Sequence, residues 1–437
     1  MKALCWEGTN EVKVEDVPEP RIRNSEDVIL KVRASAVCGS DLHLLGGYIP
    51  AMQAGDVLGH EFLGEVVEVG PGVRKRKLGD RVVVCSFTSC GRCWYCTHDL
   101  WSLCDNANTN PGITEALWGQ SIGACFGYSH ALGGCAGSHA EYIRVPFADY
   151  GTFVVPEAIE DDLAAVFASD AGPTGWMGAD LGGVKPGDVV AVWGAGGVGQ
   201  VAARAAVLLG AERVISIDRI PERLQQAEKH MGVETIDYTK TDVTAELKER
   251  SGGRGPDVCI EAVGMEAHST GPDFLYDQAK QQLRLQTDRP TAIREAIYAC
   301  RKGGSVFCLG VFAGLVDKFP LGAVMNKGLN PARRPAARAA LHPDAARSHR
   351  DGRAAHPPSR DTPDAAGRRP HGLPDVQAEG GRVRPGGVPA VTGGTRFPAH
   401  RFGRPARGSP GWPPGMHQPL LRHSRVPGEA PCPHRSR

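Results

Sequence analysis

The sequence lacks the features that a membrane or secreted protein needs. It contains no run of about 18 apolar residues, and Met1 to Cys5 do not lead into the apolar core of a signal peptide. We therefore expect a cytoplasmic protein with no membrane partner. Its 437 residues are too many for one small domain, and at about 100 to 200 residues per domain they predict two or three.

The last 107 residues lack Lys, Ile and Tyr altogether. They hold 19 of the 33 prolines and 8 of the 15 histidines, and their 19 Arg against 7 acidic residues give a formal charge of +12. Because the whole chain carries +1, residues 1–330 carry −11. Such a composition does not support a packed core, so a disordered Arg/Pro-rich tail is predicted over 329–437.

Two interpretations of this tail are open. The first is a basic arm that binds nucleic acid or another polyanion. The second is a frameshift near Leu329: when 371–392 is back-translated and read one nucleotide later, the codons allow a helix end, a turn, a closing strand and a stop. We favour the frameshift because the composition changes abruptly there. The acidic body and the scarcity of aromatic residues in the tail argue against a nucleic-acid partner.

Two hydrophobic patterns divide residues 1–328. Residues 1–155 show short β-branched runs between Gly, Pro and Asp, which predict a mostly-β domain. From 156 to 328, strands alternate with helices, and the segments 188–193, 200–210, 213–218, 257–260 and 304–308 are read as strand, helix, strand, strand and strand. The predicted fold class is α/β, with a doubly wound parallel sheet interrupted by an insertion from Met265 to about Asp288.

Cysteine is plentiful but odd in number, at 13 residues. Four of them lie in one predicted lobe, 85–110, at spacings that let four thiolates close a tetrahedral shell: Cys90, Cys93, Cys96 and Cys104. In a reducing compartment this pattern favours a structural zinc over a disulfide framework. An iron–sulfur cluster is the weaker alternative.

Cys38 and His60 form a second candidate metal pair. A thiolate and an imidazole are two of the three protein ligands that a catalytic zinc needs when one position stays open for water or substrate. Their spacing alone does not distinguish ligands from ordinary structural residues. Their place beside a nucleotide-binding fold favours the ligand interpretation.

A glycine turn follows a predicted strand and opens a predicted helix: Gly194, Ala195, Gly196, Gly197, Val198 and Gly199. Its glycines let a pyrophosphate approach the backbone at the helix N-terminus. Asp218, at the end of the next strand, can accept hydrogen bonds from a ribose diol and would repel a 2′-phosphate, so NAD is the expected cofactor. Arg219 keeps NADP open as an alternative.

Over about 1–328 the chain resembles the zinc-dependent medium-chain alcohol dehydrogenase superfamily. The resemblance rests on the order and separation of three motifs: Gly59-His60-Glu61, the four-cysteine lobe and the glycine turn. Within the superfamily, the chain resembles the formaldehyde dehydrogenase-like branch. This narrower resemblance rests on Ser169-Asp170 with Pro173-Thr174-Gly175, and on the stretches 264–268 and 294–304. The resemblance implies a GroES-like catalytic domain, a Rossmann domain, and two zinc ions per chain with NAD. We also expect a homodimer or homotetramer.

The resemblance also implies roles for single residues. Cys38 and His60 match the first two catalytic zinc ligands. The third ligand is Cys in many alcohol dehydrogenases, and counting back four residues from Thr174 gives Asp170, as in the formaldehyde branch. The alternative is that Asp170 only caps a helix that begins near Pro173.

Ser40 and His43 match the hydroxyl and the imidazole that carry the substrate proton to solvent, while hydride passes to the nicotinamide. Asp41 is expected to orient His60, and Glu61 to lie behind the metal. Thr174, the glycine turn and Asp218 are the expected coenzyme contacts.

The activity implied is oxidation of a short alcohol or a hydrated aldehyde such as formaldehyde. Three alternatives stay open: a polyol- or threonine-type zinc dehydrogenase of the same superfamily, an inactive truncated member, and a zinc-bearing nucleic-acid-binding protein.

Overall fold

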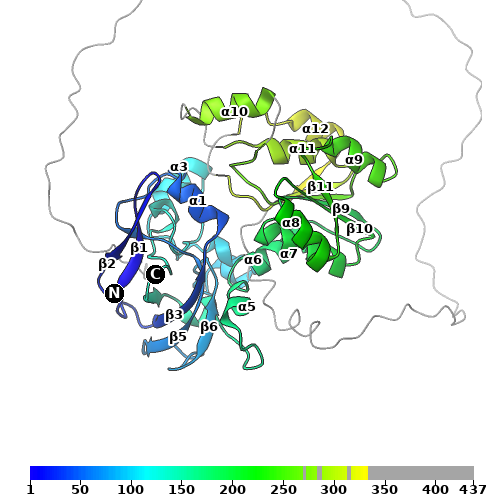
Figure 1. The fold of residues 1–437 in the computed structure, drawn as a ribbon. Helices are drawn as coiled ribbons and strands as arrows, with labels where there is room; N and C mark the ends of the chain where they lie inside the picture. Colours follow the sequence, from blue (N-terminus) through cyan, green and yellow to red (C-terminus); the bar gives the residue numbers. More distant parts are fainter. Residues whose placement is uncertain (269–271, 283–287, 313–315, 333–437) are drawn as a thin grey trace, which may run out of the picture. The chain divides into compact units, whose positions relative to one another are not determined.

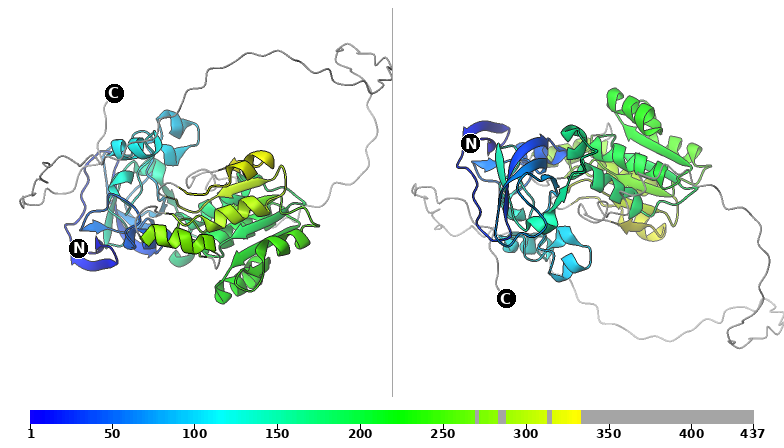
Figure 2. Two further views of the ribbon diagram at one scale, coloured as in Figure 1. Left: turned by 90° about the horizontal axis from the view of Figure 1, so that it is seen from above. Right: turned by 90° about the horizontal axis from the view of Figure 1, so that it is seen from below.

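The computed structural model describes residues 1–268, 272–282, 288–312 and 316–332. All of these described residues belong to one compact unit. The predicted tail therefore lies outside the described residues except for 329–332. Figures 1 and 2 follow the described chain from a blue and cyan part, rich in antiparallel strands, to a green and yellow part built on a parallel sheet.

The first part contains two antiparallel sheets. The larger has the order β7-β3-β5-β6-β8, formed by Tyr142–Val145, Val28–Ala36, Glu61–Val69, Arg81–Val84 and Thr152–Val154. The smaller has the order β2-β1-β4, formed by Glu11–Asp16, Lys2–Gly8 and Asp56–Val57. Short helices lie in the connections: α1 (Gly39–Leu45), α2 (Trp94–Thr97), α3 (Pro111–Trp118) and α4 (Ala148–Gly151).

Alternate residues of the larger sheet build the core of this part. Phe62 and Val66 of β5 and Val82 and Val84 of β6 point to one face, as the two-residue period of a strand requires. Three of the lobe cysteines are buried in the same cluster: Cys90, Cys96 and Cys104. The lobe is therefore continuous with the core of the β domain.

The second part is a six-stranded sheet in which every neighbouring pair is parallel. Its order is β11-β10-β9-β12-β13-β14, formed by Glu234–Asp237, Arg213–Asp218, Val189–Trp193, Val258–Glu261, Ser305–Cys308 and Asn330–Ala332. The first strand along the chain, β9, lies in the interior, and the strand order reverses at it. This reversal is the Rossmann arrangement, in which ligands bind beyond the carboxyl ends of the strands.

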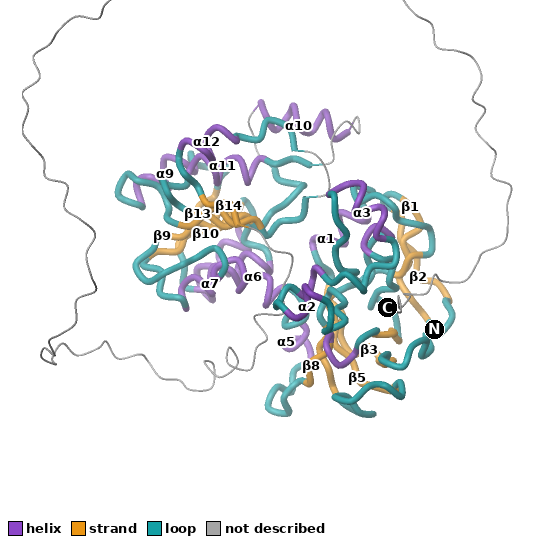
Figure 3. Tube along the Cα trace, turned by 180° about the vertical axis from the view of Figure 1, so that it is seen from behind, coloured by secondary structure: helices purple, strands orange, loops and turns teal. Residues whose placement is uncertain are grey.

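Helices cover both faces of the parallel sheet, as Figure 3 shows from behind. Val190 and Val192 of β9 pack with α6 (Ala171–Asp180) and α7 (Gly197–Leu208), whereas Ala191 and Trp193 pack with α9 (Val243–Arg250) and α11 (Thr291–Ala299). The remaining α-helices are α5 (Asp162–Val166), α8 (Pro221–Gln226), α10 (Pro272–Gln282) and α12 (Leu321–Asn326), and a π-helical turn spans Ala227–Met231. None of the helices in the described ranges has the length and apolarity needed to cross a bilayer.

The α/β class, the mostly-β domain and the doubly wound parallel sheet are as the sequence predicted, although the bounds of single elements differ. The helix expected at 200–210 begins at Gly197, and the parallel sheet continues past 328 to Ala332 through β14. The predicted insertion contains α10, while 269–271 and 283–287 lie outside the described residues.

Candidate active site and metal centres

The four lobe cysteines converge on one point. Their sulfur atoms all lie within 4.8 Å of one another. Sγ of Cys90 lies 4.0 Å from Sγ of Cys96, and Sγ of Cys93 lies 3.9 Å from Sγ of Cys104. Backbone amides of Arg92 and Cys93 donate to Sγ of Cys90 at 3.5 and 3.4 Å. Such N–H···S bonds stabilise thiolates, which are the form that binds zinc.

A second group of potential ligands contains Cys38, His60 and Glu61, whose ligand atoms lie within 4.8 Å of one another. Cys38 precedes α1, and His60 and Glu61 lie where β5 begins. His60 is 3% exposed and Glu61 is equally buried. The chain turns tightly at Gly59, where φ is +102° and a Cβ would come within 2.8 Å of the backbone nitrogen of His139, so only glycine fits ahead of His60.

Asp170 lies beside this group but is not one of its three members. Its Oδ2 is 4.0 Å from Nε2 of His60, and its Oδ1 accepts a 2.6 Å hydrogen bond from Oγ1 of Thr174. Asp170 occupies the position before α6, yet its side chain accepts no capping hydrogen bond from the first turn. The helix-cap interpretation of Asp170 therefore lacks the contact it requires.

Glu61 is the carboxylate that belongs to the group with Cys38 and His60. The resemblance instead implies that it lies behind the metal. Burial, together with the negative charge of Asp170, raises the pKa of Glu61 to about 7. Two carboxyl groups held this close repel each other when both are ionised. A divalent cation among Cys38, His60 and these acids would remove that repulsion, so the donor set fits zinc.

Asp41 lies on the other side of His60. Its Oδ1 is 3.3 Å from Nδ1 of His60, and its Oδ2 accepts a 2.8 Å hydrogen bond from the backbone amide of Cys38. Burial opposes ionisation of Asp41, but the neighbouring imidazoles of His139 and His60 hold its pKa well below the usual range. An ionised Asp41 can therefore fix the orientation of the His60 ring.

The two predicted proton carriers lie on α1. The thiol of Cys38 donates to Oγ of Ser40 over 3.6 Å, so the Ser40 hydroxyl adjoins the candidate metal group. His43 is buried, and its Nδ1 lies 2.5 Å from Oε2 of Glu266, a residue that follows β12 in the parallel-sheet part. The hydrogen bond from His43 lowers the pKa of Glu266.

The predicted glycine turn connects β9 to α7. A Cβ on Gly199 would stand 1.7 Å from the carbonyl oxygen of Gly194, whereas Gly196 and Gly197 have no atom within 4 Å of where a Cβ would lie. Space therefore remains open at the N-terminus of α7, a 12-residue helix. The amide-lined opening fits the pyrophosphate of a dinucleotide.

Asp218 ends β10 and is tied to this turn. Its Oδ2 accepts from the amide of Ala195 at 2.8 Å, and its Oδ1 accepts from the amides of Arg219 and Ile220 at 2.6 and 3.1 Å. A carboxylate offers about four acceptor positions. The three backbone amides leave little capacity for further donors, so Asp218 both shapes the turn and presents a negative charge beside it.

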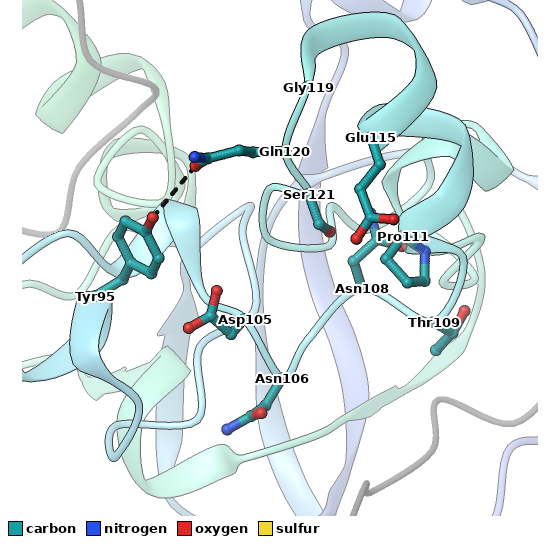
Figure 4. A pocket seen from close by; sticks show the side chains of 10 residues that line it. All are labelled: Tyr95, Asp105, Asn106, Asn108, Thr109, Pro111, Glu115, Gly119, Gln120 and Ser121. Atoms are coloured by element: carbon teal, nitrogen blue, oxygen red, sulfur yellow. Dashed lines mark hydrogen bonds between the residues drawn. The ribbon is translucent and has the colours of Figure 1, made fainter.

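A cavity of about 520 Å³ lies next to the four-cysteine lobe (Figure 4). Polar side chains line much of it, and Tyr95 closes one side through a 3.4 Å hydrogen bond to Gln120. Asn106, which also lines it, donates a 3.2 Å hydrogen bond to Sγ of Cys90. None of the predicted site residues lines this cavity.

Comparison with known proteins gives the family. Residues 24–157 match the alcohol dehydrogenase GroES-like domain, and residues 197–279 match the zinc-binding dehydrogenase domain. The zinc-type alcohol dehydrogenase-like protein AdhB of Bacillus subtilis is 43% identical over 333 residues, which cover 76% of this chain and 84% of that protein. The chain belongs to the zinc-binding alcohol dehydrogenase family.

Relatives of this alcohol dehydrogenase family include formaldehyde dehydrogenases, as the sequence resemblance predicted. The glutathione-independent formaldehyde dehydrogenase of Pseudomonas aeruginosa is 37% identical over 64% of this chain and 69% of its own. Among solved structures, alcohol dehydrogenase TADH from Thermus sp. ATN1 is 33% identical and covers 80% of this chain and 88% of its own, with a TM-score of 0.64. Zinc and a nicotinamide dinucleotide are the cofactors of this zinc-binding dehydrogenase fold.

Two residues near the dehydrogenase site carried no sequence signal of their own. The ring of Tyr128 meets that of His60 edge-on with centroids 6.1 Å apart, and its hydroxyl is buried with no hydrogen-bond partner among the described residues. Glu266 belonged to a stretch that marked the formaldehyde branch, but nothing in the sequence placed it against His43. Both contacts form only when distant segments of the chain are brought together.

Proposed function

We propose that this chain catalyses the NAD-dependent oxidation of a short primary alcohol or a hydrated aldehyde such as formaldehyde. The observation that carries the proposal is the convergence of a thiol, an imidazole and carboxylates around Cys38 and His60, with Ser40 adjoining them. This donor set on a nucleotide-binding fold is typical of zinc-assisted hydride transfer.

Cys38, His60 and Asp170 would hold the catalytic zinc, and the four lobe cysteines would hold a structural one. When bound, zinc supplies a Lewis acid that makes the substrate hydroxyl more acidic, and NAD supplies a hydride acceptor. Asp41 orients the His60 ring through Nδ1. Glu61, which belongs to the same group, would lie behind the metal and adjust the charge of the site.

Ser40 and His43 move the substrate proton. Oγ of Ser40 takes part in the first transfer from the substrate hydroxyl, and the imidazole of His43 passes the proton on to solvent. Both residues lie on α1, which keeps them at a fixed separation. Burial of His43 limits the water that competes for this proton.

The coenzyme would lie along the carboxyl ends of the parallel strands. Gly194, Gly196, Gly197, Val198 and Gly199 would bind its pyrophosphate, and Thr174 would contact it from α6. Asp218 favours NAD because its negative charge repels a 2′-phosphate.

Three further expectations belong to the same proposal. The catalytic domain would comprise 1–155 and the NAD-binding domain 156–328. The active form would be a homodimer or homotetramer in the cytoplasm. The preference for formaldehyde-like substrates is supported by the 37% identity to the Pseudomonas aeruginosa formaldehyde dehydrogenase.

The test is a substrate panel with the purified full chain, in which NADH formation is followed for formaldehyde, methanol, ethanol, sorbitol and threonine. We expect turnover with formaldehyde or a short alcohol, and loss of it on Cys38→Ala. Turnover of sorbitol or threonine alone would replace the proposal with a polyol- or threonine-type dehydrogenase. Absence of turnover in a chain that binds both zinc and NAD would indicate an inactive member.

A further inference from the structure

The contact between His43 and Glu266 joins two parts of the fold that are 223 residues apart in sequence. His43 lies on α1 in the antiparallel part, and Glu266 follows β12 of the parallel sheet. The imidazole side chain is 9% exposed and the carboxylate side chain 28%. With 2.5 Å between Nδ1 and Oε2, the pair forms a short, directed hydrogen bond.

The backbone that leads into Glu266 is fixed at Met265. The amide of Met265 donates to the carbonyl of Val311 at 2.9 Å, and the amide of Arg289 donates to the carbonyl of Met265 at 2.7 Å. Met265 is completely buried in one hydrophobic cluster with Leu44, the residue next to His43. Packing of Met265 therefore holds the backbone of the next residue, Glu266, close to α1.

This geometry selects one tautomer of His43. A carboxylate accepts hydrogen bonds and has none to donate, so Nδ1 must carry a proton and Nε2 holds the lone pair of the neutral ring. Nε2 has no hydrogen-bond partner among the described residues. It is the nitrogen left to exchange a proton.

We propose that Glu266 is a positioning residue for proton transfer: it holds His43 in the Nδ1–H tautomer and stabilises the imidazolium that forms when Nε2 accepts a proton. This inference rests on the proposed function, which makes His43 a proton carrier. The proton that leaves the substrate hydroxyl reaches Nε2 through Ser40 and is then released from Nε2 to solvent. The hydride leaves separately with its two electrons to the nicotinamide, and Glu266 stays ionised throughout.

Other groups besides His43 act on Glu266. Arg289 and His268 both act on its charge, and Arg289 also donates a 3.3 Å hydrogen bond to the Glu266 carbonyl. Loss of the Glu266 carboxylate would leave Nδ1 of His43 without this acceptor.

The experiment uses the full chain labelled with ¹⁵N-histidine, with the His43 signals identified by their loss in His43→Gln. In the parent chain we expect ring-nitrogen shifts of an Nδ1–H tautomer. In Glu266→Ala the ring-nitrogen shifts should move toward the values of a mixture of the two neutral tautomers. With NAD and a short alcohol, kcat should fall about tenfold or more, while KM for NAD changes less than about twofold.

Two further variants separate positioning from simple structural support. Glu266→Gln keeps an acceptor but removes the charge, so it should retain the tautomer and still lower kcat. Glu295→Ala is the matched control, because it also removes a partly buried carboxylate, one that accepts a 2.6 Å hydrogen bond from Nε1 of Trp193. It should leave the His43 shifts unchanged and kcat within about twofold of the parent.

The proposal is overturned if Glu266→Ala leaves both the His43 tautomer and kcat unchanged, or if Glu295→Ala lowers kcat as much. If Glu266→Ala does not fold, Glu266→Gln decides alone: an unchanged kcat there rejects the charge role. The tautomer measurement needs no turnover. A tautomer that depends on Glu266 in a parent chain that oxidises no alcohol would reject the proposed function but not the positioning contact.

Discussion

The hydroxyl of Thr174 donates a 2.6 Å hydrogen bond to Oδ1 of Asp170, one helical turn earlier. The Thr174 amide also donates to the Asp170 carbonyl at 2.9 Å. With Oδ1 engaged in this way, Oδ2 is the oxygen that remains 4.0 Å from Nε2 of His60. Thr174 thus fixes which oxygen of Asp170 faces the ligand group, in the manner of residues that orient metal ligands.

This relationship makes the third zinc ligand testable. The parent chain should contain about two zinc ions, and Asp170→Ala should contain about one, because a catalytic zinc needs about three protein ligands. Asp170→Cys should restore the second zinc in the commoner form of the family. Metal content of purified protein, measured by elemental analysis, gives the answer.

Glu61 is the competing ligand, since it belongs to the group within 4.8 Å and Asp170 does not. If Asp170→Ala keeps both zinc ions while Glu61→Ala loses one, Glu61 is the third ligand. Cys38→Ala is the reference, because it removes a ligand in either case and should hold about one zinc.

Two glycines of the turn are expected to affect different properties: Gly199 the stability of the fold, and Gly197 the binding of NAD. In Gly199→Ala the new Cβ would stand 1.7 Å from the Gly194 carbonyl, so we expect a loss of stability of about 1 to 3 kcal/mol, as for other overpacked positions. Gly197→Ala meets no atom within 4 Å and should unfold at the parent temperature, yet fill space meant for the pyrophosphate. Thermal unfolding and NAD titration of both variants measure the two effects.

The opposite pattern would contradict this account of the turn. If Gly197→Ala were the unstable variant, or if it bound NAD as tightly as the parent, the opening at the N-terminus of α7 would not be the pyrophosphate site.

Asp218 is expected to set the choice between NAD and NADP. Asp218→Asn keeps an oxygen for the Ala195 amide but removes the charge, so discrimination against NADP should fall about tenfold while the fold is retained. Asp218→Ala should in addition raise KM for NAD, because the turn loses three backbone contacts. Initial rates with both coenzymes test this, and a parent preference for NADP would direct attention to Arg219.

The frameshift interpretation predicts a difference between two chains. The sheet ends at β14, whose outer side pairs with no strand among the described residues, and an unpaired edge favours aggregation. A frame-corrected chain ending near Thr392 should be soluble and should reduce NAD with formaldehyde or a short alcohol, whereas the chain with the Arg/Pro-rich tail should be poorly soluble. Sequencing the source DNA across Leu329 tests the cause, and equal solubility and activity of the two chains would reject it.

Local sequence patterns predicted much of the fold because they reflect local physical rules. The β-branched runs became β9, β10, β12 and β13, since buried parallel strands are continuously apolar. The start of α7 was placed too late because glycines were counted as turn, although Gly197 and Gly199 already belong to the helix.

The arrangement of the candidate site was less predictable. The four cysteines lie close in sequence, so their spacing alone indicated a cluster. In contrast, the contact of His43 with Glu266 and that of Tyr128 with His60 depend on how separate segments pack. Residue spacing likewise does not determine whether Asp170 or Glu61 lies nearer to Cys38, because the answer depends on distances of a few ångströms.

The different sequence spans of the two metal centres imply an order of assembly. The sulfurs of the lobe come from one short segment, Cys90 to Cys104, so closing that loop costs little chain entropy. The other centre draws on α1, the start of β5 and the segment before α6, and it forms only when these distant segments have met. During refolding with scarce zinc, the lobe should therefore take up its ion first, and recovery of alcohol oxidation should lag behind zinc uptake.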